Sequence, residues 1–316
     1  MNLPFHLKTQ RKPKMSWLDR YFFEPNLAQK VLAFALLPFS LFYALVAVLN
    51  TKVRRKLKFN APIISVGNLT LGGNGKTPVC KAIAHLFAPT KCVFIVLRGY
   101  KRKSNGLVVV KNGKEPLCDV DISGDEAMEY ALDERIFGVI VSENRVQGIE
   151  KALNLGATLI LLDDGFSKRF IEKFDILLES VQKPHFNFTL PSGAYRLPKC
   201  FAKKADFIAR EGEDFVRHSR VSENKNAILV TAIAKPFRLY EHFSKAKACY
   251  FFADHYKFQK NELEALLKKH HCDTLMLTFK DFVKVRQMGL KTQLIELDIE
   301  LKDEFKRAIL AFVEKF

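Results

Sequence analysis

Short apolar runs alternate with longer mixed stretches along most of the chain, and this alternation predicts the fold. Before residue 199, apolar runs of strand length occupy residues 63–66, 92–97, 107–110, 138–141, 158–162 and 175–178. Stretches of helical length and spacing separate them, at residues 77–87, 124–132 and 144–155. Strands that alternate with helices in this way predict an α/β domain with a doubly wound parallel sheet, whose ligands bind at the carboxyl ends of the strands.

The alternation continues after residue 199 with shorter elements. We predict strands at residues 206–209, 227–231, 249–252, 273–277 and 293–297. We predict helices at residues 236–245, 261–269 and 303–315. The chain is therefore divided into an N-terminal segment (residues 1–59), a larger α/β domain (residues 60–198) and a second, smaller α/β domain (residues 199–316).

The N-terminal segment contains an uncharged apolar stretch, residues 31–49. As a helix with a rise of ~1.5 Å per residue it would extend roughly 29 Å, which is close to the thickness of the hydrocarbon core of a bilayer. We therefore predict a hydrophobic membrane helix. Pro38 would kink this helix, so that it either crosses the bilayer or lies in one leaflet. A helix buried in a soluble core is the alternative.

Basic residues flank this stretch on both sides. They are Lys8, Arg11, Lys12 and Lys14 before it, and Lys52, Arg54, Arg55, Lys56 and Lys58 after it. Such residues are attracted to anionic lipid headgroups, although positive charge on both sides gives no direction of crossing. Residues 1–59 are therefore expected to associate with a membrane surface.

The chain as a whole is basic, with a formal net charge of +17 in 316 residues. Because 48% of the residues are hydrophobic, the composition is that of a globular protein. The charge is compatible with nucleic acid, an anionic membrane or a phosphorylated substrate as the partner. The six cysteines include no CxxC pair, so neither a zinc site nor a disulfide framework is indicated, and a reducing cytoplasmic environment is the simpler interpretation.

A glycine-rich turn joins the first predicted strand to the first predicted helix. It contains Gly72, Gly73, Asn74, Gly75, Lys76, Thr77 and Pro78. Glycines let backbone N–H groups approach an anion, and the start of a helix adds the positive end of its dipole. Lys76 is placed to reach the phosphates of ATP, and the Thr77 hydroxyl to bind Mg²⁺. The turn departs from the pattern GxxxxGK[ST] at Thr70, and tight packing of a strand against a helix is the alternative.

Polar side chains at the ends of other elements are weaker candidates. Asp163 and Asp164 follow an apolar strand, where an acid can hold Mg²⁺ in a phosphoryl-transfer site, although carboxylates also begin ordinary turns. Asp125 and Glu126 open a predicted helix, where they serve equally well as favourable cap charges. Taken alone, His255 is typical of a surface histidine.

Together these residues resemble the tetraacyldisaccharide 4'-kinase family of lipid A biosynthesis. The similarity extends from about residue 15 to residue 290 and rests on separate blocks in the order of the family. The blocks are Ser65-Val66-Gly67-Asn68-Leu69-Thr70 with Gly72-Gly73-Asn74-Gly75-Lys76-Thr77-Pro78; Arg98-Gly99-Tyr100; Gly124-Asp125-Glu126; Asp163-Asp164-Gly165-Phe166; Leu190-Pro191-Ser192-Gly193; Asp254-His255; and Thr278-Phe279-Lys280-Asp281. A phosphate loop alone would be shared by many families, whereas this series of blocks is specific.

The resemblance implies a P-loop lipid kinase. Such an enzyme transfers the γ-phosphate of ATP to the 4'-hydroxyl of the lipid A disaccharide 1-phosphate, and residues 60–198 would form its nucleotide-binding domain. The resemblance implies that Asp125 acts with His255 as the base, alongside Lys76. It also implies that Asp163 and Asp164 are the Mg²⁺-site acids, and that Tyr100 and Arg145 lie near the substrate or the phosphates.

The resemblance also implies where the enzyme works. We expect a monomer at the cytoplasmic face of the inner membrane, bound to that leaflet through its N-terminal segment, with no nucleic acid partner. Three departures from the family pattern affect details of lipid and nucleotide contact: Lys101, where the family commonly has glycine; Ser167-Lys168, where it has Gln-His; and Ala194-Tyr195-Arg196-Leu197-Pro198.

Two other classes of protein remain as alternatives. A membrane-bound P-loop ATPase or GTPase switch has a similar turn, but it would need a lysine where this chain has Leu71, and the guanine motif Asn-Lys-x-Asp is absent. A basic, non-enzymatic binder of nucleic acid would show interleaved aromatic and basic residues or a zinc finger pattern, and the sequence has neither.

Overall fold

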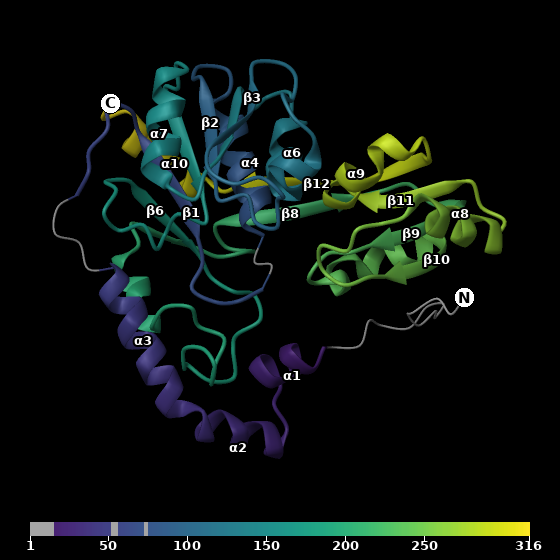
Figure 1. Ribbon diagram of the computed structural model, residues 1–316, viewed down its shortest axis with the longest axis horizontal. Coiled ribbons are helices and arrows are strands. Elements are labelled where there is room, and N and C mark those ends of the chain that lie inside the picture. Colours follow the sequence, from purple (N-terminus) through teal and green to yellow (C-terminus); the bar gives the residue numbers. More distant parts are fainter. Residues whose placement is uncertain (1–15, 52–55, 73–74) are drawn as a thin grey trace.

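Two β-sheets lie side by side and are joined by a pair of long strands (Figure 1). The computed structural model describes residues 16–51, 56–72 and 75–316. The larger sheet has the strand order β3-β4-β2-β5-β1-β6-β7. Its strands are β1 (Ile63–Gly67), β2 (Val93–Leu97), β3 (Val108–Asn112), β4 (Gly138–Val141), β5 (Leu159–Asp163), β6 (Phe174–Leu178) and β7 (Phe207–Ala209).

The larger sheet is parallel except at one edge. Only β3 pairs antiparallel, with β4. Every residue of β1, β2, β4 and β5 is buried, as expected of strands covered by helices on both faces. One face packs against α4 (Lys76–Phe87), α6 (Asp125–Ala131) and α10 (Asp303–Val313), while α7 (Arg145–Asn154) covers the other. The α/β class predicted from the alternation of elements is confirmed.

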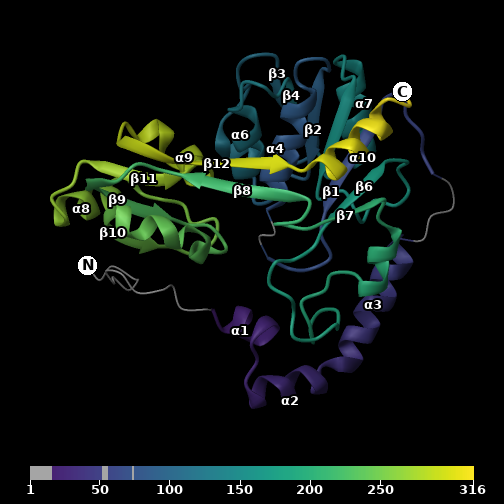
Figure 2. The ribbon, with the colours of Figure 1, turned by 180° about the vertical axis from the view of Figure 1, so that it is seen from behind.

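The smaller sheet has the order β10-β9-β11-β12-β8. Its strands are β8 (Phe215–Arg220), β9 (Asn224–Thr231), β10 (Ala246–Phe251), β11 (Thr274–Thr278) and β12 (Lys291–Leu301). The first half of β12 pairs parallel with β11, and its second half pairs antiparallel with β8. Seen from behind, β8 and β12 run together from the smaller sheet to the larger one (Figure 2). This pair of strands is called the connecting ribbon below.

Short helices complete both parts of the molecule. Around the smaller sheet lie α8 (Lys260–Lys269), α9 (Phe279–Val285) and the 3₁₀ helices Pro236–Lys245 and Arg286–Met288. On the side of the larger sheet lie α5 (Val120–Ser123) and the 3₁₀ helix Lys199–Lys204. The sequence predicted residues 236–245 as helical with these bounds, but it missed both β8 and α9.

The division between the sheets does not coincide with the predicted boundary at residues 198 and 199. Strand β7 pairs with β6 and therefore belongs to the larger sheet. Helix α10 also packs there, with the rings of Phe207 and Phe305 stacked 4.8 Å apart. The chain thus leaves the larger sheet after β7, builds the smaller sheet, and returns along β12 to complete the larger core.

The N-terminal segment forms three helices, α1 (Trp17–Phe23), α2 (Leu27–Ala35) and α3 (Leu37–Thr51). The predicted membrane helix at residues 31–49 is therefore divided between α2 and α3, which meet at an angle of 55°. The bend lies next to Pro38, whose ring clashes with the carbonyl four residues earlier and which lacks an N–H donor. Within the described part of the chain, no single helix is long and apolar enough to cross a bilayer, although α2 and α3 pass that test as a bent pair.

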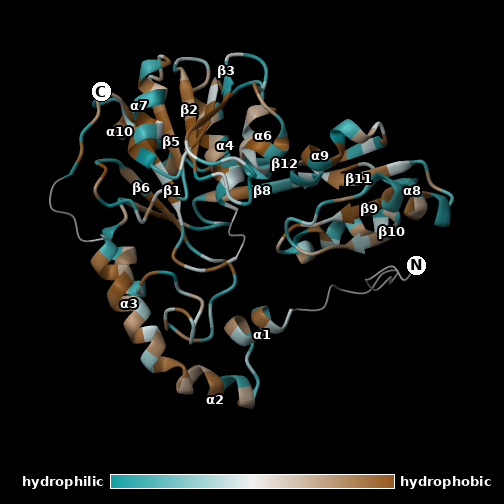
Figure 3. Ribbon diagram, viewed as in Figure 1, coloured by the Kyte–Doolittle hydropathy of each residue, from teal (hydrophilic) through white to brown (hydrophobic). Residues whose placement is uncertain are grey.

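Helix α3 is apolar along most of its length (Figure 3), and most of its apolar side chains are exposed. It is attached to the rest of the molecule by polar contacts at Ser40 and by the packing of Ala47 and Val48 against a buried apolar cluster. Ser40 is its one buried residue. The backbone N–H of Ser192 donates to the Ser40 hydroxyl (2.8 Å), and the Thr189 hydroxyl donates to the Ser40 carbonyl (2.8 Å). The alternative of a helix buried in a soluble core is therefore wrong for α3. The basic residues of segments 1–15 and 52–55 lie outside the described residues.

Candidate functional site

The turn between β1 and α4 has the backbone shape that its glycines allow. Gly72 and Gly75 both have positive φ angles, 98° and 78°, a region that other residues enter only at a cost. Gly75 directly precedes α4, so the first N–H groups of this helix face the turn. Gly73 and Asn74, both predicted to bind the nucleotide, lie outside the described residues. Pro78 occupies the first turn of α4, where its missing N–H costs no hydrogen bond.

Lys76 points back across this turn. Its Nζ donates to the Asn68 side-chain oxygen (3.0 Å) and lies 3.7 Å from the Asp164 carboxylate. Both partners follow the carboxyl ends of neighbouring parallel strands, β1 and β5. The structure therefore brings Lys76 to the edge of the sheet at which ligands of such folds bind.

Asp163, at the end of β5, is the more buried of the two predicted Mg²⁺-site acids, with 4% of its surface exposed. Its Oδ2 accepts hydrogen bonds from the Tyr130 hydroxyl (2.8 Å) and the Thr77 hydroxyl (3.3 Å). Its Oδ1 is buried and has no hydrogen-bond partner among the described residues. Burial raises the pKa of Asp163, although the charge of Lys76 opposes this shift.

Asp164 has a different environment. Its carboxylate accepts two hydrogen bonds from the Arg196 guanidinium, at 2.9 and 3.1 Å. Burial by itself would raise the pKa of Asp164, but the charges of Lys76 and Arg196 lower it to about 2. The sequence did not predict Arg196 as a site residue. The sequence of residues 194–198 contains no motif that predicts a contact between Arg196 and the end of β5.

Arg145 begins α7 and is buried beneath this group. Its guanidinium donates to the carbonyl oxygens of Ser142 (2.6 Å) and Asp163 (3.3 Å). The residue was expected near the substrate or the phosphates, and it does line the same cavity as Lys76. In this structure, its hydrogen bonds stabilise the backbone that carries Asp163.

Asp125 and His255 come together from the two sheets although they are 130 residues apart. The Nδ1 of His255 lies 3.1 Å from Asp125 Oδ2, and the ring of Tyr100 packs edge to face against the imidazole at 5.7 Å. Burial alone would raise the pKa of Asp125, but the hydrogen bond to His255 and the charge of Lys284 lower it. The ionised carboxylate is therefore placed to accept a hydrogen bond from the imidazole, as the predicted acid–base pair requires.

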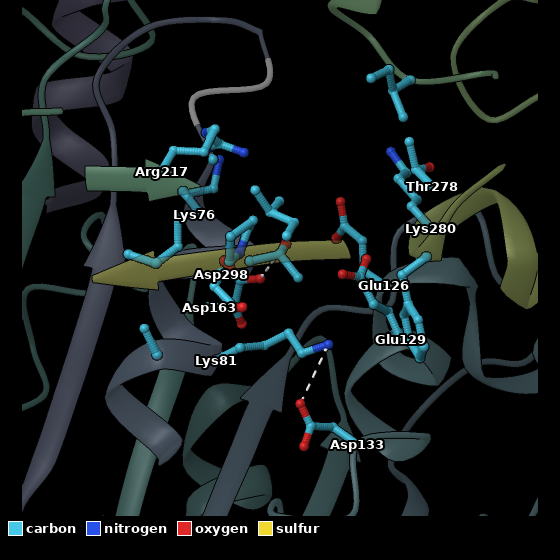
Figure 4. A pocket seen from close by; sticks show the side chains of 18 of the residues that line it. Lys76, Lys81, Glu126, Glu129, Asp133, Asp163, Arg217, Thr278, Lys280 and Asp298 are labelled. Carbon is cyan, nitrogen blue, oxygen red and sulfur yellow. Dashed lines mark hydrogen bonds and ion pairs between the residues drawn. The ribbon is translucent and has the colours of Figure 1, made fainter. Parts of the chain in front are cut away.

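A cavity of about 990 Å³ lies between the two sheets (Figure 4). Of the predicted site residues, it is lined by Gly75, Lys76, Thr77, Pro78, Tyr100, Arg145, Asp163 and Asp164. Asp125, His255 and Gly72 are not among the residues that line it, although Glu126, which follows Asp125, does line it. The remaining lining includes residues from the connecting ribbon, so both sheets contribute to the cavity.

Sequence reasoning missed two carboxylates of the cavity. Glu126 was interpreted as a cap charge, yet it lines the cavity together with Glu129 and Lys280. Burial, followed by repulsion from Asp163, raises the pKa of Glu126 to about 7. Spacing along α6 places Glu126 and Glu129 on one face of that helix, and this was the one available signal.

Comparisons with known proteins agree with this geometry. A model of the family described as tetraacyldisaccharide-1-P 4'-kinase (LpxK) matches residues 32–223 and 214–314. A tetraacyldisaccharide 4'-kinase of Campylobacter jejuni subsp. jejuni serotype O:6 is 68% identical over 300 residues, covering 95% of this chain and 96% of the relative. One of Helicobacter pylori is 41% identical over 293 residues, covering 92% of each.

A solved structure shares the fold. LpxK from Aquifex aeolicus, crystallised in complex with ATP, matches this chain with a TM-score of 0.74 and 26% sequence identity, covering 89% of this chain and 99% of the other. The resemblance seen in the sequence blocks is confirmed over nearly the full chain. The protein therefore belongs to the tetraacyldisaccharide-1-P 4'-kinase family.

Proposed function

We propose that this protein is an ATP-dependent lipid kinase that transfers the γ-phosphate of ATP to the 4'-hydroxyl of tetraacyldisaccharide 1-phosphate. The product is the bisphosphorylated disaccharide lipid IVA of lipid A biosynthesis. Family membership supports the reaction, and the ATP complex of the Aquifex aeolicus neighbour supports the phosphoryl donor.

One observation carries the proposal. The Asp125–His255 pair, at 3.1 Å, adjoins a cavity whose other wall carries Lys76 and the start of α4. A hydroxyl acceptor needs a proton acceptor close to a phosphate-binding turn, and this arrangement supplies both. Tyr100 belongs to the cavity and also packs against His255, so it connects the two halves of the site.

The residues at the end of β5 fit a magnesium ion. The Oδ1 of Asp163, which has no hydrogen-bond partner in the described part of the chain, and the Thr77 hydroxyl are oxygen ligands of the kind that Mg²⁺ takes, and Asp164 lies next to them. Among the described residues no cluster of three or more His, Cys, Asp or Glu side chains could hold a metal, which accords with Mg²⁺ that is held partly by nucleotide phosphates. When bound, Mg²⁺ neutralises charge that develops on the phosphates.

The chain's own residues perform the remaining tasks. Lys76 and the first N–H groups of α4 bind the β- and γ-phosphates and hold the γ-phosphate in place. Asp125 and His255 together accept the proton of the attacking 4'-hydroxyl, and Asp125 stabilises the imidazolium that forms. Arg145 keeps the carboxyl end of β5 in position through its two carbonyl contacts.

The N-terminal helices suit a lipid acceptor. Leu41, Phe42 and Leu45 of α3 expose 65%, 68% and 56% of their surface, and residues of α2 are similarly exposed. Contiguous exposed apolar side chains of this kind mark membrane or partner surfaces. We propose that α2 and α3 bind the cytoplasmic leaflet of the inner membrane, that the enzyme acts as a monomer, and that it has no nucleic acid partner.

The test is transfer of labelled γ-phosphate from ATP, with Mg²⁺, to purified lipid A disaccharide 1-phosphate in detergent micelles. We expect a labelled, more polar lipid from the wild-type protein and from Lys114→Ala, an exposed control on the larger domain. Lys76→Ala should produce none. Release of labelled inorganic phosphate without labelled lipid would contradict the proposal and favour a membrane ATPase switch.

A further inference from the structure

A fully buried tyrosine of α6 contacts the carboxylate that is proposed to hold Mg²⁺. Tyr130 has none of its surface exposed and packs in the core of the larger sheet together with Val79 and Cys80 of α4. Packing alone requires only the ring, whereas a buried hydroxyl needs a hydrogen-bond partner. The Tyr130 hydroxyl donates to Asp163 Oδ2 at 2.8 Å and lies 3.5 Å from the Thr77 carbonyl oxygen. The polar end of this core residue is therefore at the candidate metal site.

Asp163 has few other contacts that fix its orientation. Its neighbour Asp164 is paired with two cations. In the described part of the chain, the Asp163 side chain instead accepts from two hydroxyls, and both donate to Oδ2: Tyr130 at 2.8 Å and Thr77 at 3.3 Å. The longer of these hydrogen bonds is the weaker one. Tyr130 is thus the main group that determines which oxygen of Asp163 is left without a donor, namely Oδ1.

This asymmetry suits a metal ligand. A hydroxyl that donates to a carboxylate makes a short, directional hydrogen bond, so Oδ2 is held and the plane of the carboxylate is fixed. A buried carboxylate without a paired cation is costly, so a bound cation accounts for the free oxygen better than packing does. Carboxylates that bind metals are commonly held by a hydrogen bond from behind, and loss of that partner weakens metal binding.

Tyr130 also shares a helix with the proposed base. Asp125 is the first residue of α6, and Tyr130 is the last but one. The helix therefore contacts both halves of the site, because Asp125 pairs with His255 while Tyr130 binds Asp163. A displacement of α6 would change both contacts together.

We infer that Tyr130 is a positioning residue for phosphoryl transfer, whose hydroxyl holds Asp163 so that Oδ1 is available to the divalent cation of the bound nucleotide. This inference rests on the proposed function and adds a residue to the metal site. Tyr130 is not among the residues that line the cavity. Its effect on metal binding is therefore exerted through Asp163.

Binding of the non-hydrolysable ATP analogue AMP-PNP to the full chain in detergent, without lipid, tests the inference. The ratio of the affinities in Mg²⁺ and in EDTA measures how much the metal strengthens binding. For Tyr130→Phe we expect this ratio to fall about 10-fold or more, while the affinity in EDTA changes by less than about threefold. The matched control is Tyr250→Phe, which removes the hydroxyl of another buried tyrosine, bonded to His270 in the smaller sheet's part of the molecule. This control should leave both affinities unchanged.

Steady-state phosphorylation of the lipid provides a second readout. Tyr130→Phe should need about 10-fold more Mg²⁺ than the wild type for half-maximal activity. A defect in packing alone would lower the activity without changing the Mg²⁺ concentration at which it is half-maximal. Tyr250→Phe should require the same Mg²⁺ concentration as the wild type.

An unchanged ratio of affinities in Tyr130→Phe would overturn the inference, and so would an equal fall in Tyr250→Phe or a wild-type affinity that does not depend on Mg²⁺. Tyr130→Leu also lacks the hydroxyl and is measured in the same way if Tyr130→Phe does not fold. If neither variant folds while Tyr250→Phe does, Tyr130 is required for packing and the inference is rejected. Failure of the wild-type protein to phosphorylate the lipid would contradict the proposed function alone, because the analogue is bound without lipid.

Discussion

Three residues other than glycine adopt left-handed backbone conformations at the site. They are Lys101, Asp164 and His255, with φ angles of 59°, 57° and 62°. Such conformations cost of order 1 kcal/mol or more each, and they persist where the surrounding structure holds them in place. Lys101 stands where the family commonly has glycine. The lysine keeps the left-handed backbone conformation of this turn, which glycine would adopt without strain.

Asp125 is the residue whose removal best separates catalysis from binding. Asp125→Ala leaves Lys76 and the start of α4 intact but removes the carboxylate bound to His255. We expect kcat to fall about 10²- to 10⁴-fold, while the KM for ATP stays within about threefold, in steady-state assays with the lipid acceptor. Glu150→Ala, an exposed change on α7, should behave as the wild type does. An equal loss of ATP binding would contradict the assigned role.

Glu126 predicts a pH dependence of stability. Its folded-state pKa is raised from 4.5 to about 7, so the folded protein binds this proton more tightly than the unfolded chain. The stability that this provides is fully present below pH 4.5 and is lost as the pH rises to about 7. Glu126→Gln cannot ionise, and near pH 8 it should exceed the wild type by up to about 3 kcal/mol.

Denaturant unfolding of the wild type and Glu126→Gln from pH 5 to pH 8 measures this difference. The two proteins should differ least at pH 5, where Glu126 is mostly neutral in the folded state. If the difference in free energy of unfolding does not change with pH, the pKa of Glu126 is not raised in the folded protein, and the prediction is wrong. Glu115→Gln, on an exposed turn, provides the control.

At the scale of elements, Asp281 connects α9 to β9. The carboxylate is fully buried and accepts hydrogen bonds from the Thr231 hydroxyl (2.8 Å), the Ala232 N–H (3.1 Å) and the Thr278 hydroxyl (2.8 Å). The Ala232 carbonyl in turn accepts from the N–H of His255. The block containing Asp281 therefore supports the loop that carries the proposed base.

Asp281→Ala should destabilise the protein by about 3–5 kcal/mol, because it leaves buried donors without their acceptor and removes the nearer of the two carboxylates that face Lys284. Chemical denaturation provides the measurement. Asp273→Ala, which breaks an exposed ion pair with Lys291, should destabilise the protein far less than Asp281→Ala does, because solvent screens that pair. Similar losses in the two variants would refute the structural role of Asp281.

The elements that the sequence predicted are those with a local signal. Strands β1, β2, β4 and β5 are fully buried, so their residues form unbroken apolar runs. Strand β8 is polar over most of its length, from Arg217 to Arg220, and it exists because it pairs with the far end of β12. Helix α9 has seven residues and begins directly after β11, so it leaves little periodicity to detect.

The same distinction applies to the site. Lys76, Thr77 and Asp163 follow strand ends in a recognisable order, and the structure brings them together as predicted. Arg196 and Arg217 reach the site from segments without such a pattern, because their positions depend on long-range packing. The pairing of Asp125 with His255 was available from the resemblance alone.

At the scale of the whole molecule, membrane binding is proposed to depend on the outward face of α3. Replacing Phe42 and Leu45 together by Glu should lower the partitioning of the protein onto vesicles containing anionic lipid by about 100-fold or more, since each buried side chain contributes about 1.5–3 kcal/mol. ATP affinity should stay unchanged, because neither residue lines the cavity.

Sedimentation with vesicles measures the partitioning. The paired control is replacement of Leu117 and Ile122 by Glu, which alters exposed apolar side chains near α5 instead. If both pairs reduce partitioning to the same degree, a general effect of negative charge explains the result and the role of α3 is rejected.

Because the chain returns to the larger sheet at its C-terminal end, the core of that sheet cannot be completed until the last helix has been synthesised. Phe305, Ile309 and Val313 of α10 complete the core beneath α4, yet they are translated after the entire smaller sheet. The apolar helices α2 and α3 emerge long before that core can close. The segment proposed to bind the membrane is therefore synthesised before the α/β core can be completed, so the proposed role of α2 and α3 predicts contact with the bilayer before the rest of the chain has folded.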